Sequence, residues 1–453
     1  MADYYYTDRR SRNISRLIVA IALAVIVALL IWAVAVASRD KNVGTPEKQM
    51  LIESVEAGYP EGANNVTEAF LLWGFPEFSK NMVFNVEACY HNSYYKELPE
   101  NEALASDAAE YFIENYYDNI NLSDKAEVTH ALCNSFIYAV GDKYGIYRNA
   151  EEQRDYSSEL AGEIIGIGVT VTRNTDGLIL ITSVIADTPA QRAGILTSDI
   201  ITAVDGARVA DVGYRAASEM ITGDEGTTVS LTVLRNGEEL NIDIVRAKIN
   251  DVTVSYKMLE GNIGYISISG FVSPTALQFV NAMDALAEAG AAGIIFDLRS
   301  NPGGLLSSVI TTISCIVPTG TRLVSFSNGS SPVYATHGGT SPEDIDRVYT
   351  LPTVILINRS TASAGELFTA AMRDFADDGR FELTIIGETS YGKGVMQSGI
   401  SFTDGSALTL TTALYYSPSG INYDGVGISP DIALAEDDDP IVSALAEMAN
   451  LLN

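Results

Sequence analysis

The chain has 453 residues, of which 47% are hydrophobic, so it can bury a large core in two or three domains. Acidic residues outnumber basic ones by 58 to 28, and the resulting net charge of −30 repels nucleic acid and leaves no basic stripe for phosphate contacts. The three cysteines, Cys89, Cys133 and Cys315, lack the spacing of a metal site, so no metal is expected. A disulfide between Cys89 and Cys133 is an open alternative for a domain outside the cell.

The first predicted element is an uninterrupted apolar run, Leu17–Val36, that is long enough to cross the hydrocarbon core of a membrane as a helix. Four arginines lie in the sixteen residues before it. This arrangement predicts a single-pass anchor in the cell membrane, with residues 1–16 in the cytoplasm and the bulk of the chain outside it. A cleaved signal peptide is the alternative, because Ala35-Val36-Ala37 has the small-x-small form of a cleavage site.

Residues 37–160 are predicted to be mostly helical, with breaks where glycine and proline cluster. The clearest helices are Asp107–Tyr117 and Ser123–Val140. We expect Ser123 to cap the start of the second helix and Gly141 to end it.

Residues 161–249 have a different texture, with short alternating strands such as Val169–Val171 and Val229–Val233 between glycine turns. They predict a compact, mostly β module. The module resembles a PDZ domain in five motifs: Gly166-Ile167-Gly168-Val169, Thr188–Ile195, Asp199-Ile200-Ile201, Val204-Asp205-Gly206 and Gly226-Thr227. The resemblance implies that the N–H groups of Gly166, Ile167, Gly168 and Val169 receive the terminal carboxylate of a polypeptide, while the adjacent sheet edge pairs with its chain.

Residues 250–435 alternate strands and helices and predict an α/β domain. The expected buried strands are Ile263–Ile268, Gly293–Asp297, Thr353–Ile357 and Leu383–Ile386, the expected helices are Pro274–Ala289 and Ala364–Phe375, and Ser401–Tyr416 returns to β character. Residues 436–453 are expected to form an acidic link and a terminal helix. The predicted fold class is therefore a multidomain α/β and α+β protein, with a transmembrane helix, a helical segment and a PDZ-like β module before an α/β core.

Two motifs near the C-terminal end indicate chemistry: Ser360–Glu366 places a hydroxyl among small residues, and Gly392-Lys393-Gly394 places a lysine between glycines. An alcohol becomes a good nucleophile when a neighbouring group takes its proton, and a desolvated lysine can be neutral enough to do so. We therefore expect Lys393 to be buried among small and apolar groups, with a pKa well below that of free lysine. Gln397 can hydrogen-bond the amine without adding a charge.

With Gly264-Tyr265-Ile266, Asp297–Gly304, Gly387-Glu388-Thr389 and Gly427–Asp431, these motifs resemble the C-terminal processing peptidases, also called tail-specific proteases, and they occur in the family's order. The resemblance implies a serine endopeptidase that acts on polypeptides with exposed C-termini. It places the nucleophile on Ser363, the general base on Lys393, the group that orients the base on Gln397, and the oxyanion hole on the backbone amides of Gly303 and Ala364. It implies no metal or organic cofactor and a possible homo-oligomer.

This sequence departs from the family at Thr222, which stands where an arginine commonly precedes the glycine, so coupling between the PDZ module and the active site is an open question. The segment Asp374–Arg380 is longer than usual, and we expect a surface loop to absorb the extra length.

Four other interpretations compete for the same residues. Gly387–Lys393 fits the start of a phosphate-binding loop, but Gly394 replaces the required Ser or Thr. A serine-histidine triad would need His91, His130 or His337 as its base. Ser360 is an alternative nucleophile to Ser363. Either Ser363 or Lys393, taken alone, would be interpreted as an ordinary surface residue. A catalytically silent PDZ-type receptor for protein tails is the alternative from another functional class.

Overall fold

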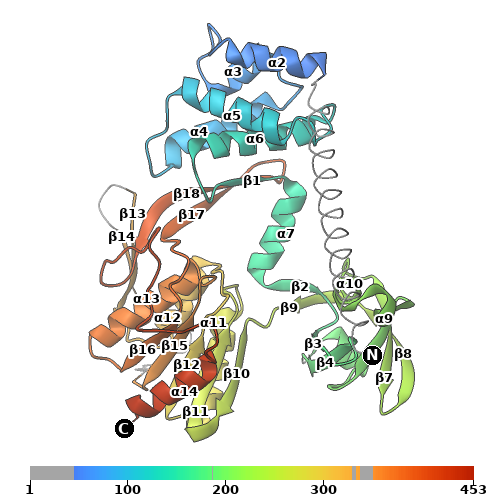
Figure 1. Cartoon of the computed structure of the whole chain (residues 1–453), viewed down its shortest axis with the longest axis vertical. Coiled ribbons are helices and arrows are strands. Elements are labelled where there is room, and N and C mark those ends of the chain that lie inside the picture. The colour runs from blue at the N-terminus through green and yellow to red at the C-terminus, as the bar shows by residue number, and fades with distance from the viewer. Residues whose placement is uncertain (1–44, 186, 329–332, 337–349, 453) are drawn as a thin grey trace, which may run out of the picture. The chain divides into compact units, whose positions relative to one another are not determined.

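The computed structural model describes residues 45–185, 187–328, 333–336 and 350–452 (Figure 1). The predicted membrane helix, Leu17–Val36, lies outside these ranges, as does His337. Within them, no helix is both long and apolar enough to cross a bilayer. Contacts divide the described chain into a helical unit, residues 45–92 and 98–143, and a larger unit, residues 93–97 and 144–452.

The helical unit consists of α2 (Pro46–Glu56), α3 (Val66–Trp73), α4 (Lys80–Ser93), α5 (Asn101–Asn115) and α6 (Lys125–Val140), which bury large aromatic side chains between them. Gly141 ends α6 in the left-handed conformation, as predicted. The predicted cap at Ser123 is wrong by one residue, because the side chain of Asp124 accepts the N–H groups of Ala126 and Glu127. None of the three cysteines, all of which the structure describes, forms a disulfide, so Cys89 and Cys133 are not bridged.

Two elements join the helical unit to the β module. β1 (Ile146–Arg148) pairs with β18 (Ala407–Tyr416), far along the chain, and α7 (Ala150–Ala161) follows it. The strand β1 falls in the region predicted to be mostly helical, and contacts place the boundary of the helical unit at Lys143 instead of residue 160. A three-residue strand has too short a pattern to be recognised without its partner.

The β module is built on a sheet in the order β3-β4-β5-β7-β8, with β6 beside β5. These strands are β3 (Val169–Arg173), β4 (Ile179–Val184), β5 (Ile200–Val204), β6 (Ala207–Arg208), β7 (Thr228–Arg235) and β8 (Glu238–Val245), and the helices are α8 (Pro189–Arg192), α9 (Val209–Val212) and α10 (Tyr214–Ile221). Both predicted strands lie within β3 and β7. The ribbon of β2 (Glu163–Gly166) and β9 (Ala247–Asn250) connects the module to the rest of its unit.

The core is a six-stranded sheet in the order β10-β11-β12-β15-β16-β19, parallel except for β10. Its strands are β10 (Val254–Leu259), β11 (Ile263–Ile268), β12 (Gly293–Asp297), β15 (Thr353–Ile357), β16 (Leu383–Gly387) and β19 (Ile432–Ala433), accompanied by α11 (Thr275–Glu288), α12 (Leu306–Ser314), α13 (Ala364–Asp377) and the terminal helix α14 (Pro440–Leu451). The three predicted strands on β11, β12 and β15 are confirmed to the residue.

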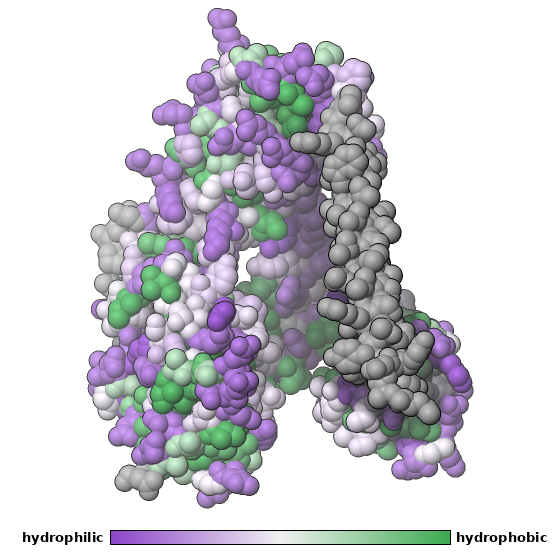
Figure 2. All heavy atoms as spheres, in the orientation of Figure 1, coloured by the Kyte–Doolittle hydropathy of each residue, from purple (hydrophilic) through white to green (hydrophobic). Residues whose placement is uncertain are grey.

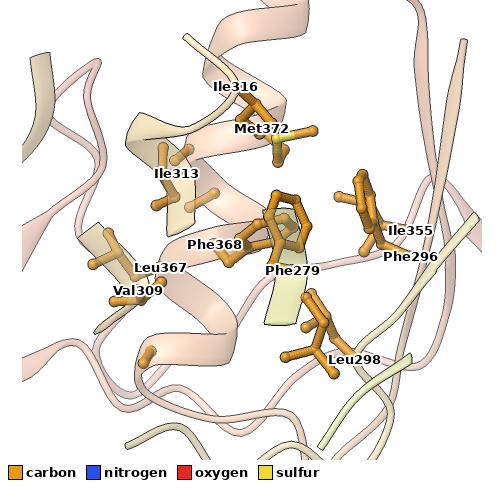
Figure 3. Packing of buried hydrophobic residues seen from close by; sticks show 14 of the residues in the cluster. Phe279, Phe296, Leu298, Val309, Ile313, Ile316, Ile355, Leu367, Phe368 and Met372 are labelled. Atoms are coloured by element: carbon orange, nitrogen blue, oxygen red, sulfur yellow. The ribbon is translucent and has the colours of Figure 1, made fainter. Parts of the chain in front are cut away.

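Helix α13 is held in place by an apolar cluster (Figure 3). Phe368 on α13 packs edge-on against Phe296 of β12, with ring centroids 5.5 Å apart, and against Phe279 of α11. All three rings are fully buried. Because α13 begins directly after the residue predicted to be the nucleophile, this packing fixes the position of that residue.

A second sheet is built around β18, which pairs with β1, β13 and β17, and β14 pairs with β13. The lysine motif directly precedes β17 in this sheet. Its remaining strands are β13 (Arg322–Ser327), β14 (Val333–Thr336) and β17 (Val395–Ser401). The loop predicted at Asp374–Arg380 is wrong at its start, because α13 continues to Asp377 and the buried carboxylate of Asp374 accepts the N–H of Ser419. Hydrophilic residues cover much of the face shown in Figure 2, in keeping with the large net charge.

Candidate active site

Ser363 is the N-cap of α13, at the end of the short loop that follows β15. Its backbone has φ 54° and ψ −115°, a conformation that is strained for a residue with a side chain. Neighbouring bonds hold the loop: the hydroxyl of Thr361 donates to the carbonyl of Leu298, and the N–H of Ala362 donates to the carbonyl of Asn301. Ser363 therefore projects from a rigid turn between a strand and a helix.

The carboxylate of Glu366 joins this turn to the lysine motif. Glu366 is fully buried. Its Oε2 accepts the N–H of Ser363 at 2.9 Å and the N–H of Lys393 at 2.8 Å, while its Oε1 accepts the hydroxyl of Ser390 and the N–H of Gly392. Because one oxygen atom binds both amides, the backbones of Ser363 and Lys393 lie beside one another.

Lys393 lies two residues before β17, and it is half-buried where we predicted burial among small and apolar groups. Its Nζ lies 2.6 Å from Oε1 of Gln397 and 4.7 Å from the centre of the Tyr144 ring. The amide of Gln397 in turn donates to the carbonyl of Tyr144 at 2.5 Å. Gln397 is thus fixed with its oxygen toward the amine, and the low pKa of Lys393 stays a prediction.

Tyr415 on β18 contacts both the serine motif and the lysine motif. Its hydroxyl donates to the carbonyl of Lys393 at 2.7 Å and lies 3.4 Å from Oγ of Ser363. Burial raises the pKa of Tyr415 far above the ordinary value, so the hydroxyl keeps its proton and acts as a donor. Sequence reasoning missed both Tyr415 and Glu366.

The predicted oxyanion residues lie on either side of Ser363. Gly303 has φ 104°, and a Cβ built on it would come within 2.7 Å of Cβ of Ser363 and 2.9 Å of the Ala364 nitrogen. In the described chain, the N–H of Ala364 has no hydrogen-bond partner, whereas the N–H of Gly303 donates to Oδ1 of the buried Asn301 at 2.8 Å. Ala364 is thus ready to donate, and Gly303 would have to exchange its partner to do so.

A partly buried ion pair holds the start of the Gly303 loop. Arg299 binds both carboxylate oxygens of Asp297, and the hydroxyl of Tyr265 donates to Oδ2 of Asp297 at 2.7 Å. Burial and this hydrogen bond raise the pKa of Tyr265 to about 12. The loop therefore leaves β12 from a fixed point.

We expect Gly303→Ala to lower kcat/KM for peptide cleavage by at least about 100-fold, the typical cost of losing one oxyanion donor. The added methyl group would push Ser363 and Ala364 apart. Gly290→Ala is the matched control, because Gly290 has a similarly positive φ and nothing within 4 Å of its Cβ position. Activity of Gly303→Ala as high as that of Gly290→Ala would contradict the proposed crowding of the site.

One cavity of about 610 Å³ brings the predicted catalytic residues together. It is lined by Ser363, Ala364, Gly303, Lys393, Gln397 and Tyr415, among others. Ser360 is exposed and does not line it, and His91 and His130 belong to the helical unit. The strand β17 follows Lys393 where a phosphate-binding loop needs a helix. The described residues contain no group of side chains suited to a metal ion.

The predicted peptide-binding residues lie apart from this cavity, at the junction of β2 and β3. Ile167 and Gly168 form the link between these strands, with Gly166 ending β2 and Val169 starting β3. The carbonyl groups of Ile167 and Gly168 accept hydrogen bonds, but their N–H groups have no partner in the described ranges. β3 is an edge strand of its sheet, so its outer edge can pair with a peptide.

Comparison with known proteins identifies the family. Residues 262–434 match Peptidase family S41, and residues 165–245 match the PDZ domain family. The carboxy-terminal processing protease CtpA of Bacillus subtilis (strain 168) is 33% identical over 328 residues, which are 72% of this chain and 67% of that protein. The chain belongs to the C-terminal processing serine proteases.

Other relatives agree with this assignment. A probable CtpA-like serine protease of Staphylococcus haemolyticus (strain JCSC1435) is 32% identical over 321 residues, covering 71% of this chain and 62% of that relative. The chain thus spans a little under two thirds of that relative's length. The solved structure of a lipoprotein from Streptococcus agalactiae has a TM-score of 0.50 at 13% identity, and the match covers 83% of this chain and 98% of that one. This last similarity concerns the fold alone.

Proposed function

We propose that this S41 family member is a membrane-anchored, extracytoplasmic endopeptidase that captures protein C-termini through its PDZ domain and cleaves peptide bonds with Ser363 and Lys393. The observation that carries the proposal is the carboxylate oxygen shared by the amides of these two residues at the edge of one cavity. An arrangement that uses four hydrogen bonds to one buried carboxylate is more than simple packing requires.

The proposed reaction is acyl transfer to the serine. Oγ of Ser363 attacks the scissile carbonyl carbon, and its proton passes to Nζ of Lys393. The N–H of Ala364, at the N-terminus of α13, stabilises the oxyanion that forms. The ammonium of Lys393 then protonates the leaving amine, and the same amine later takes a proton from the water that hydrolyses the acyl-enzyme.

The PDZ domain supplies the proposed recognition step. The unpartnered N–H groups of Ile167 and Gly168 are suited to a terminal carboxylate, and the open edge of β3 to the residues before it. Gly168 itself has little room for change, because a Cβ there would come within 2.3 Å of Thr188. Polypeptides with exposed C-termini are therefore the proposed substrates.

Membrane attachment rests on the apolar run Leu17–Val36 and the arginines before it. We expect the full chain to sediment with membranes and a chain lacking residues 1–37 to be soluble. Mass spectrometry of the mature N-terminus tests the alternative, since a chain that begins near Ser38 has lost its anchor.

Digestion of an unfolded protein tests the proposed activity. We expect Ser363→Ala to abolish cleavage while the circular dichroism spectrum and the thermal midpoint stay close to those of the parent chain. Ser360→Ala is the matched control, because this exposed serine lies three residues away and outside the cavity, and it should cleave normally. Normal cleavage by Ser363→Ala would refute the assignment of the nucleophile.

A further inference from the structure

Helix α7 forms one wall of the active-site cavity. Gln153, Tyr156, Glu159 and Leu160 all line it. The C-terminal end of the helix is fastened to the core, because the carbonyl of Leu160 accepts the N–H of Ser273 at 3.2 Å, and the carbonyl of Gly162 accepts the N–H of Asp251 at 2.7 Å. This end of α7 therefore belongs to the wall of the site.

The charged side chains that line this wall are acidic, although the guanidinium carbon of Arg148 lies 3.8 Å from the centre of the Tyr156 ring without lining the cavity itself. Apart from Lys393, the charged residues that line the cavity are Glu159 and Asp251. Neither carboxylate has a hydrogen-bond or ion-pair partner among the described residues. The last turn of α7 contains no basic residue, so the partial negative charge at its C-terminus adds to theirs.

A neutral acceptor reinforces this charge. Oε1 of Gln153 is buried and has no hydrogen-bond donor, while the amide nitrogen of the same side chain donates to Ser157. A buried acceptor without a donor costs free energy that a ligand N–H group would recover. Acidic side chains, a helix C-terminus and an unpaired oxygen on one wall all favour a cation.

The residues of this wall and Ser363 line the same cavity. Ser273, which binds Leu160, is two residues from Phe271, whose N–H donates to the carbonyl of Gly303 at 2.8 Å. A Cβ built on Gly303 would in turn come within 2.7 Å of Cβ of Ser363. A substrate bound at Ser363 would thus have its neighbouring side chains within reach of the acidic wall.

We propose that Glu159 and Asp251 form a specificity subsite for a lysine or arginine side chain of the substrate near the cleaved bond. The proposal rests on the proteolytic function proposed above. A charged substrate side chain would pair with the carboxylates and donate to Gln153, whereas aspartate or glutamate at the same position would be repelled. The acidic wall would thereby select among polypeptides that the PDZ domain accepts without regard to this residue.

A peptide series tests the subsite with the full chain in detergent. Internally quenched peptides are identical except for one position near the cleaved bond, which carries lysine, arginine, glutamate or norleucine, the uncharged counterpart of lysine. We expect kcat/KM to be about fivefold higher with lysine or arginine than with norleucine at one position, and lower with glutamate. The ratio between two peptides cancels any effect of the variants on the charge of Lys393.

Variants of the wall complete the test. Glu159→Gln and Asp251→Asn should each reduce the lysine-to-norleucine ratio, the double variant should bring it close to one, and Glu159→Lys should favour the glutamate peptide. Glu151→Gln is the control, because Glu151 is exposed on α7 and does not line the cavity. Ser363-dependent cleavage without a lysine preference, or with one unchanged in the double variant, would overturn the subsite alone. Absence of any Ser363-dependent cleavage would instead refute the proposed function.

Discussion

Lys393→Ala is expected to lower kcat/KM for peptide cleavage by about 10³-fold or more, because the chain would lose the base that takes the proton of Ser363. The side chain is half-buried and its removal leaves the backbone bonds to Glu366 in place, so the fold should persist. Steady-state hydrolysis of a quenched peptide measures the loss, and the thermal midpoint checks the fold.

Two further variants make this result specific. Lys393→Arg should be as inactive as the alanine variant, since a guanidinium keeps its charge and cannot accept a proton. Lys248→Ala should cleave normally, because Lys248 pairs with Glu163 at the exposed ribbon of β2 and β9 and does not line the cavity. Near-normal turnover by Lys393→Ala would remove the proposed base.

Glu366→Gln is the second large effect that we expect. The amide group would present a donor to N–H and O–H groups that now share two carboxylate oxygens. We expect the free energy of unfolding to fall by about 3 kcal/mol, as for other broken buried polar networks. Because the turn of Ser363 and the loop of Lys393 would separate, kcat should fall by about 100-fold even in the molecules that remain folded.

Denaturant unfolding and single-turnover cleavage, measured on the same samples, separate these two effects. Glu388→Gln is the matched control: Glu388 lies just after β16, and its carboxylate pairs with Arg359 at the surface. An exposed pair of this kind contributes little, so the control should lose neither stability nor activity. Unchanged kcat in Glu366→Gln would show that Glu366 supports the fold without positioning the two motifs.

The sequence was most informative where local patterns suffice. The short apolar-rich segments of β11, β12 and β15 marked buried strands, and Gly141 marked a helix end. Local signals also failed in predictable ways, because Ser123 and Asp124 are both good caps and the pattern could not choose between them.

Contacts between distant residues could not be predicted in this way. The three-residue strand β1 is defined by its pairing with β18, in which Tyr147 lies opposite Leu408. Tyr415 reads as an ordinary strand residue until the fold places its hydroxyl between the two motifs. Glu366 did carry a local signal, since Ser363 and Glu366 have the spacing of a capping box, but its bonds to the lysine loop depend on tertiary structure.

Covalent labelling tests the central claim most directly, that a lysine amine activates a neighbouring serine. The full chain is treated with a fluorophosphonate, which phosphonylates an activated serine with loss of fluoride, and mass spectrometry locates the modified residue and measures its labelling rate. We predict modification of Ser363 in the parent chain, at a rate that rises with pH as Lys393 loses its proton, and none above background in Lys393→Ala. Labelling of Ser360, or of Ser363 at the same rate without Lys393, would contradict the account.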